Sequence, residues 1–210
     1  MLKDCEPNVP ELLNFYFQFS NHILIKTAPL LDIKAGLNEL KFVKNIHIIA
    51  VENEVKELLW EIEKDFSGQP TMKTVNLTKS KTEYFDFIWE EYLSKATLGK
   101  PEKYIYEPNA AIMKSGGFDE VTHFFNVKKL HPHSHLYTSN ELMNFCGRVF
   151  ELQQTIPYNK KNMMQLGLSK ANITIRNFPE TVETVRKKWK IKDGGGIYCF
   201  FTTDEENQKI

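Results

Sequence analysis

The chain has 210 residues, 41% of them hydrophobic and 12% aromatic, which is enough for one sizeable domain or two to three small ones and excludes a disordered tail. Its 27 Lys and Arg balance 27 Asp and Glu, so the molecule as a whole has no electrostatic bias toward nucleic acid. Three scattered cysteines argue against a disulfide framework, and no apolar run reaches the roughly 20 residues of a membrane helix. We therefore expect a cytoplasmic protein with no membrane contact.

The first predicted elements are two short apolar strands. Residues 22–33 form an apolar run that Pro29 interrupts, and residues 46–51 form a second. Neither run alternates, which is typical of strands buried on both faces of a parallel sheet. Residues 34–42 between them are compatible with a short helix.

Further predicted helices and strands follow up to about residue 95. Residues 54–66 carry apolar side chains at helical spacing with acids on the other face, which predicts an amphipathic helix. Residues 71–77 and 83–89 predict two further strands. The order of strands and helices predicts an α/β fold.

A polar segment at 95–103 predicts a domain boundary. Beyond it, Asn109 can cap a short helix over 110–115 that Gly116 ends. From Arg148 onward the expected elements form a small α+β module: strand 148–152, basic segment 159–170, strand 171–178, helix 180–190, a glycine turn at 193–196 and strand 197–203.

The stretch HPHSH holds histidines at 131, 133 and 135. Alternate residues of one strand stand roughly 6–7 Å apart, too far for three imidazoles to converge easily on one ion. Pro132 also predicts an edge or irregular segment. We expect no bound metal here.

The second half carries a basic region that the balanced total conceals, with nine Lys or Arg against two Glu between Lys160 and Lys192. On the helix at 180–190, Val182, Val185 and Trp189 share one face, which leaves the cations toward solvent. Such a cluster suits contact with phosphates, although a solvated helix face is the equally favoured alternative. The candidate RNA-binding residues are Lys160, Lys161, Lys170, Arg176, Arg186, Lys187, Lys188 and Lys190.

A second candidate site lies at the carboxyl end of the first predicted strand, where α/β sheets place ligands. Lys26, Pro29 and Asp32 are candidates for the substrate side of a pocket. An ordinary connecting loop is the alternative.

Seven blocks of the chain resemble a known family in order and spacing: DCEP (4–7), ILIKTAPLLDI (23–33), EVKELLW (54–60), KTVNL (73–77), YIYEPNAAIMKSG (104–116), KLHPHSHLYTS (129–139) and ANITIRNFP (171–179). They look like the C-terminal part of a Bacteroidetes-type class I S-adenosylmethionine-dependent methyltransferase. The resemblance implies a partial Rossmann-like methyltransferase sheet in residues 1–95. It also implies two small α+β modules, a ferredoxin-like segment at 102–142 and a THUMP-like, RNA-binding domain at 147–210.

The resemblance implies S-adenosylmethionine as the cofactor of the full-length family, held by a glycine-rich turn. Residues 1–100 contain only the isolated Gly36, Gly68 and Gly99, and the family's catalytic Asp-Pro-type motif would precede the block at 4–7. We therefore expect no catalytic residue in this chain and no cofactor bound by it alone. An exposed apolar sheet edge should then self-associate or pair with an upstream methyltransferase half.

Two interpretations remain open. The chain is the C-terminal portion of an RNA methyltransferase, or it is a non-catalytic RNA-binding protein derived from the same family. RNA is the expected partner in both, because the THUMP-like resemblance and the basic region point the same way.

Overall fold

The computed structural model describes residues 2–90 and 95–210, which divide into two compact units. Unit 1 contains residues 2–90 together with Asn109–Gly117, and unit 2 contains residues 95–108 together with Phe118–Ile210. In the described part of the chain, no helix has the length and apolar character to cross a membrane.

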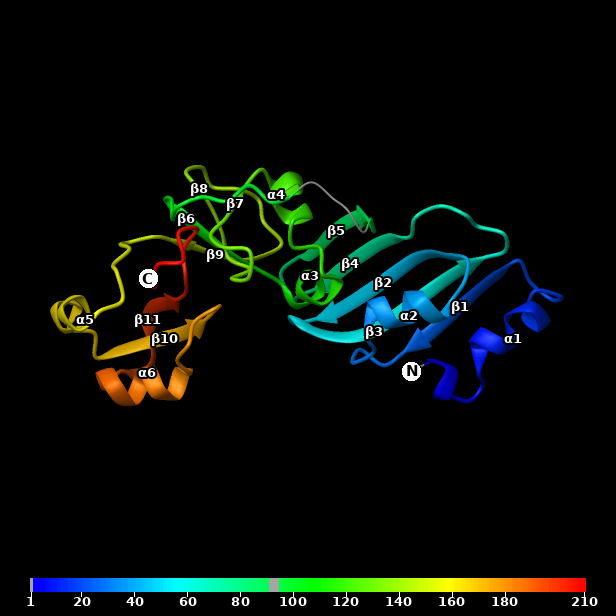
Figure 1. Cartoon of the computed structure of the whole chain (residues 1–210), viewed down its shortest axis with the longest axis horizontal. Coiled ribbons are helices and arrows are strands. Elements are labelled where there is room, and N and C mark those ends of the chain that lie inside the picture. The colour runs from blue at the N-terminus through cyan, green and yellow to red at the C-terminus, as the bar shows by residue number, and fades with distance from the viewer. Residues whose placement is uncertain (1, 91–94) are drawn as a thin grey trace. The chain divides into compact units, whose positions relative to one another are not determined.

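Unit 1 is a five-stranded sheet with the strand order β1-β3-β2-β4-β5 (Figure 1). Only β2 and β4 run parallel; the other neighbouring strands are antiparallel. Its elements are η1 (Leu2–Asp4), α1 (Val9–Tyr16), β1 (His22–Thr27), α2 (Ile33–Glu39), β2 (Val43–Val51), β3 (Glu54–Glu63), β4 (Thr71–Leu77), β5 (Thr82–Ile88) and α3 (Ala110–Ser115).

The predicted helix at 54–66 is wrong, because this segment forms β3. Glu52 and Asn53 both have positive φ, 49° and 64°, and make the two-residue turn of a β-hairpin with β2. After that turn, Leu58, Trp60 and Ile62 alternate into the core and are fully buried. Apolar residues at 58 and 62 are four apart, a spacing that fits one face of a helix and also one face of a strand. Spacing alone therefore could not distinguish a helix from a strand here.

The prediction of strands buried on both faces of a parallel sheet is also wrong. Along β2, Ile46 and Ile48 are fully buried on the core face. On the other face, His47 is paired with Glu61 at the partly exposed surface, and Val51 is 38% exposed. One face of the sheet carries the core and the other remains partly open to solvent.

A close contact between α2 and the sheet organises this core. The indole of Trp60 is fully buried and its Nε1 donates a hydrogen bond to Thr27 Oγ1 at 2.9 Å. A Cβ atom at Gly36 would lie 2.3 Å from Cη2 of that ring. Glycine therefore allows α2 to approach the sheet this closely.

Replacing Gly36 by Ala should lower the free energy of unfolding. Alanine gains about 1 kcal/mol of helix propensity, but overpacking against an anchored indole costs about 1–3 kcal/mol. We expect a net loss of about 1 kcal/mol in urea unfolding followed by tryptophan fluorescence. Gly196→Ala is the matched control, since an added Cβ there meets nothing within 4 Å. Unchanged or greater stability of Gly36→Ala would contradict the packing argument.

The short helix α3 forms as its sequence predicts and packs on the sheet of unit 1. Asn109 Oδ1 accepts from the Ile112 amide at 3.0 Å, and Gly116 ends the helix with φ 76°. The Asn109 amide also donates to the buried Glu83 carboxylate at 2.8 Å. Asn76 and Lys81 also bond that carboxylate, and the hydrogen bonds lower the pKa of Glu83 against the opposing effect of its burial.

Unit 2 contains a four-stranded sheet, order β7-β8-β6-β9, and a two-stranded parallel sheet of β10 and β11. The predicted glycine turn lies inside β11 as a bulge, with Gly194 and Gly195 at φ 91° and 90°. The elements are β6 (Tyr104–Pro108), α4 (Glu120–Phe125), β7 (Lys128–Lys129), β8 (Tyr137–Ser139), β9 (Gly147–Glu151), α5 (Lys160–Leu166), β10 (Lys170–Ile175), α6 (Val182–Trp189) and β11 (Lys192–Phe201).

Candidate nucleic-acid interface

The predicted lysines lie on α5, on α6 and its C-cap, and at the start of β10. Asn159 caps α5 by accepting from the Asn162 amide at 2.9 Å, and Met163 buries the inner side of the helix. Lys160 and Lys161 therefore begin the helix on its exposed side.

The structure confirms that Val185 and Trp189 form the inner, apolar face of α6. Val185 is fully buried, and Trp189 Nε1 donates to the hydroxyl of Tyr158 at 3.0 Å. Lys187 and Lys190 are exposed, and Lys190 ends the helix in the left-handed conformation with φ 57°.

Two of the predicted cations on α6 hold the module together. The Arg186 guanidinium donates to Asp193 Oδ1 at 2.5 Å and to the backbone oxygens of Ala171 and Ile191. Lys188 donates to Glu180 Oε1 at 2.8 Å and to the Tyr158 hydroxyl at 3.1 Å. The hydrogen bond to Glu180 raises the pKa of Lys188. Both side chains are thus occupied by internal contacts.

Arg176 also has an internal partner, Glu107. The sequence alone did not predict a role for Glu107. Glu107 is only 5% exposed and accepts from Arg176 Nη2 at 2.9 Å. The same carboxylate accepts from Arg148 Nε at 2.8 Å and from its Nη2. Arg148 is 41 residues from Glu107, and only the pairing of β6 with β9 brings them together.

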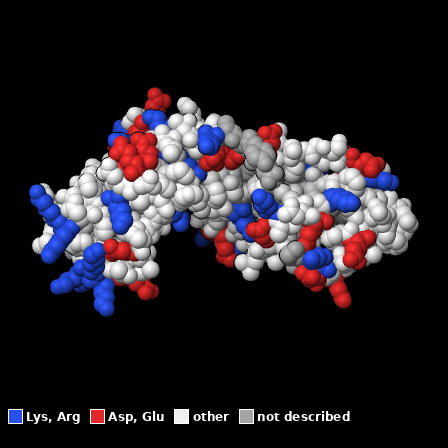
Figure 2. Space-filling model, in the orientation of Figure 1, with Lys and Arg blue, Asp and Glu red and all other residues white. Residues whose placement is uncertain are grey.

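The remaining predicted cations are available to solvent. Lys160, Lys161, Lys170, Lys187 and Lys190 are exposed, and the ion pairs found among the described residues involve none of them. Figure 2 shows Lys and Arg side chains gathered at the end of unit 2 where Figure 1 places α5 and α6. We call these five residues the lysine surface.

The second set of predicted site residues has local structural partners. Lys26 on β1 pairs with Glu57 Oε1 at 3.0 Å on the neighbouring β3. Asp32 caps α2 by accepting from the Ala35 amide at 2.7 Å, and Pro29 is half-buried in the loop before it. Their assignment to a substrate pocket stays a prediction.

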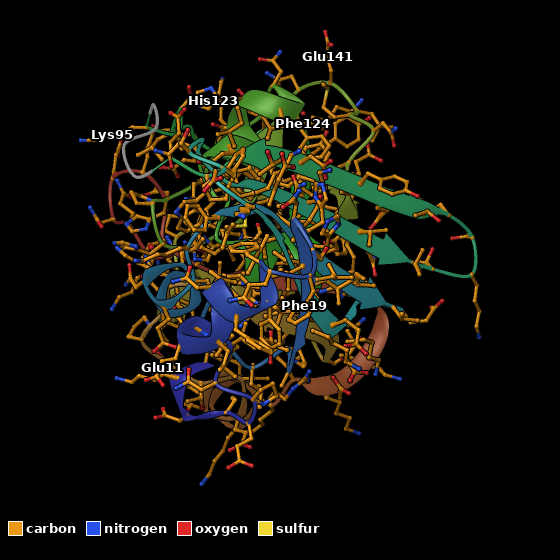
Figure 3. The ribbon with its side chains drawn as sticks, turned by 90° about the vertical axis from the view of Figure 1, so that its right-hand side faces the viewer. Glu11, Phe19, Lys95, His123, Phe124 and Glu141 are labelled. Atoms are coloured by element: carbon orange, nitrogen blue, oxygen red, sulfur yellow. The ribbon has the colours of Figure 1, made fainter. Side chains whose placement is uncertain are left out.

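An open sheet edge lies beside these residues. Among the described residues β1 pairs with β3 only, so its other edge has no neighbouring strand, and at His22 the Ser20 hydroxyl bonds both backbone groups. Apolar side chains of α1, of β1 and of the loops that flank β1 are exposed; Figure 3 labels Phe19, 75% exposed, in the segment between α1 and β1. The others are Leu12, Phe15, Leu24 and Leu30. An unpaired edge with exposed apolar residues is the usual sign of an interaction surface.

The histidine stretch is a turn between β7 and β8. His131 is buried; its Nδ1 accepts from the His133 amide at 3.1 Å and lies 2.9 Å from Asn177 Nδ2, and its Nε2 lies 2.9 Å from Asn207 Oδ1. Nδ1 as acceptor places the ring proton on Nε2, so the ring bridges three segments of unit 2. Within residues 2–90 and 95–210 no group of three or more His, Cys, Asp or Glu is placed to hold a metal ion. The expectation that no metal binds stays a prediction.

His135 stacks on Phe118 with ring centroids 3.7 Å apart. Burial, and then the nearby positive charge of Lys129, lower the pKa of His135 to about 4. Its backbone has φ 52°, a conformation that asparagine also tolerates.

His135 should therefore make stability depend on pH. Between pH about 6.5 and about 4 the unfolded chain binds a proton that the folded chain does not. The free energy of unfolding should fall as pH decreases through this window, by up to about 3 kcal/mol less the solvent screening of a half-buried ring. In urea unfolding the wild type should lose more stability between pH about 6.5 and about 4 than His135→Asn, which lacks this titrating group. Identical pH profiles for the two proteins would contradict this account.

Two family models match the chain. A ferredoxin-like domain matches residues 104–145, and a THUMP domain-like model matches residues 147–210. No curated protein matches the chain.

A crystal structure of a candidate methyltransferase from Porphyromonas gingivalis W83 is similar over 99% of this chain, with a TM-score of 0.90 and 33% sequence identity. The present chain spans 54% of that protein's chain. The two family models confirm the ferredoxin-like and THUMP-like modules and the α+β architecture predicted for the second half. The chain therefore contains a ferredoxin-like and a THUMP-like domain and shares its fold with about half of a candidate methyltransferase.

Proposed function

We propose that this chain is the RNA-contacting portion of an S-adenosylmethionine-dependent RNA methyltransferase. The support is the similarity to a candidate methyltransferase over 99% of the chain, together with a THUMP-like domain that presents exposed lysines. The similarity suggests methyl transfer, and the exposed lysines suggest a substrate that carries phosphates.

The observation that carries the catalytic part of the proposal is the open edge of β1. A methyltransferase sheet has further strands that hold the cofactor, and β1 offers unpaired backbone groups to receive them. Side chains of a neighbouring strand would cover part of Leu24, which is on the exposed face of β1 and is 63% exposed. Unit 1 would then supply one side of a larger sheet.

The residues of unit 1 do not fit S-adenosylmethionine by themselves. A class I site brings a glycine-rich backbone turn close to the ligand, but Gly36 is packed against Trp60 and Gly68 against Phe66. The adjacent Gly116 and Gly117 end helix α3 and do not follow a strand, and among the described residues of unit 1 we find no glycine-rich turn at the end of a strand. The cofactor would be held by strands paired with β1, and no catalytic step is assigned to residues of this chain.

The RNA-binding part of the proposal rests on the lysine surface. Exposed lysines with no ion-pair partner among the described residues can each neutralise one phosphate and release a counterion. RNA affinity measured at several salt concentrations tests this part: variants that lack residues of the lysine surface should bind RNA more weakly and with a smaller salt slope than the wild type.

A further inference from the structure

Unit 2 contains a cleft with a volume of about 780 Å³. Its lining comes from β9, from β11 and from the segment at 152–156 that connects β9 toward α5. Leu130 and Leu136 contribute buried apolar surface, and Phe150 and Phe200 pack against them. The interior of the cleft is thus mainly apolar.

Aromatic and apolar side chains are exposed along the cleft. Tyr198 is 45% exposed and its ring centroid lies 4.9 Å from that of Phe150. Ile197 and Val149 are also exposed. Exposed aromatic rings beside an apolar cleft provide a surface on which a planar ligand can stack.

A positive charge lies directly beside this aromatic pair. The Arg148 guanidinium carbon lies 5.5 Å from the Phe150 ring centroid and 5.6 Å from that of Tyr198. Arg148 and Arg176 share the single carboxylate of Glu107, so the three groups together carry a net positive charge. Arg176 Nε is buried without a hydrogen-bond acceptor among the described residues. The net positive charge of the cluster reaches solvent at the Arg148 side chain, which is 49% exposed and can contact an anion there.

The connecting segment adds polar groups to the cleft wall. Residues 153–156 belong to no helix or strand, and their amides make none of the backbone hydrogen bonds found in the described chain. Gln153, Gln154 and Thr155 line the cleft with their side chains or backbone. Free amide and carbonyl groups beside a stacking surface can hydrogen-bond the edge of a nucleobase.

We propose that this cleft binds one unpaired nucleotide of RNA, with the base stacked on Tyr198 and the phosphate at Arg148. The proposal rests on the proposed function, which makes RNA the ligand of unit 2. An unpaired nucleotide fits because a base inside a duplex exposes no face for stacking. The lysine surface would hold the flanking phosphates without regard to sequence, while the cleft would select for a single-stranded nucleotide.

The test uses the full chain, a hairpin RNA with a short single-stranded oligoadenylate extension, and the same hairpin with a blunt end. Tyr198→Ala should weaken binding of the extended hairpin about tenfold and leave binding of the blunt hairpin unchanged. Tyr198→Phe is the matched control and should bind both RNAs as the wild type does, because it keeps the ring. Arg148→Gln keeps a donor for Glu107 and should lower the salt slope for the extended hairpin by about one.

Crosslinking identifies the contact directly. A photoreactive thiouridine in the extension should form its adduct on the peptide that contains Tyr198. If Tyr198→Ala binds both RNAs normally, or adducts form only outside the cleft, the cleft proposal is overturned. The proposed function then still stands if lysine variants weaken binding, whereas absence of any RNA binding by the wild type overturns both.

Discussion

Replacing Lys161, Lys187 and Lys190 together by Gln should weaken RNA binding by at least about tenfold at physiological salt and lower the salt slope by about 2–3. These side chains are exposed and outside the internal ion pairs, so each is free to neutralise a phosphate. Because phosphate contacts carry no sequence information, the loss should be similar for all RNA sequences. Fluorescence anisotropy at several salt concentrations measures both quantities.

The matched control removes the same charge from unit 1. Lys41, Lys64 and Lys79 are exposed, and their replacement by Gln should leave RNA affinity and salt slope unchanged. Equal weakening by both triple variants would mean that net charge alone governs binding. If the variant at Lys161, Lys187 and Lys190 bound RNA with unchanged affinity, these lysines would be ordinary solvated side chains that do not contact RNA.

Arg186 and Lys188 are unsuitable for this test although they belong to the same basic run. Arg186 joins α6 to Asp193 and to two backbone oxygens, and Lys188 joins it to Glu180 and Tyr158. Their removal would change stability together with charge, so a loss of RNA binding could not be attributed to phosphate contacts.

The second large effect concerns the cofactor. In calorimetric titration the chain alone should show no micromolar binding of S-adenosylmethionine, because no glycine-rich turn lies among the described residues of its sheet. Binding should appear after addition of the part of the P. gingivalis protein that this chain does not match, supplied as a separate polypeptide. The added strands would pair with β1 and bring the missing backbone turn.

A variant of the edge strand provides the control for this complementation. Leu24 on β1 is 63% exposed, and Leu24→Lys places a charge where the added polypeptide would bury an apolar residue. It should reduce complementation, and it should also reduce self-association of the chain in light scattering. Micromolar binding by the unmixed chain would contradict the cofactor argument. Failure of complementation with RNA binding intact would favour the alternative of a non-catalytic RNA-binding protein.

Sequence by itself determined those elements whose signals are local. Asn109 and Gly116 bound α3 because a cap hydrogen bond and a left-handed glycine act within one helical turn. The buried Val185 on α6 followed from helical periodicity, which is a property of the segment alone. The family resemblance supplied the two modules of the second half, which the family models confirm.

Only the tertiary structure decided the features that depend on partners distant in the chain. Residues 54–63 satisfied two periods, and pairing with β1 and β2 selected the strand. A Lys or Arg in the basic run looks equally available in the sequence, yet Asp193 and Glu107 engage Arg186 and Arg176, while Lys187 is exposed and has no ion-pair partner in the described part of the chain. A side chain's charge is a property of its residue type, but its availability depends on which opposite charge the fold brings within reach, and that cannot be read from neighbours in the chain.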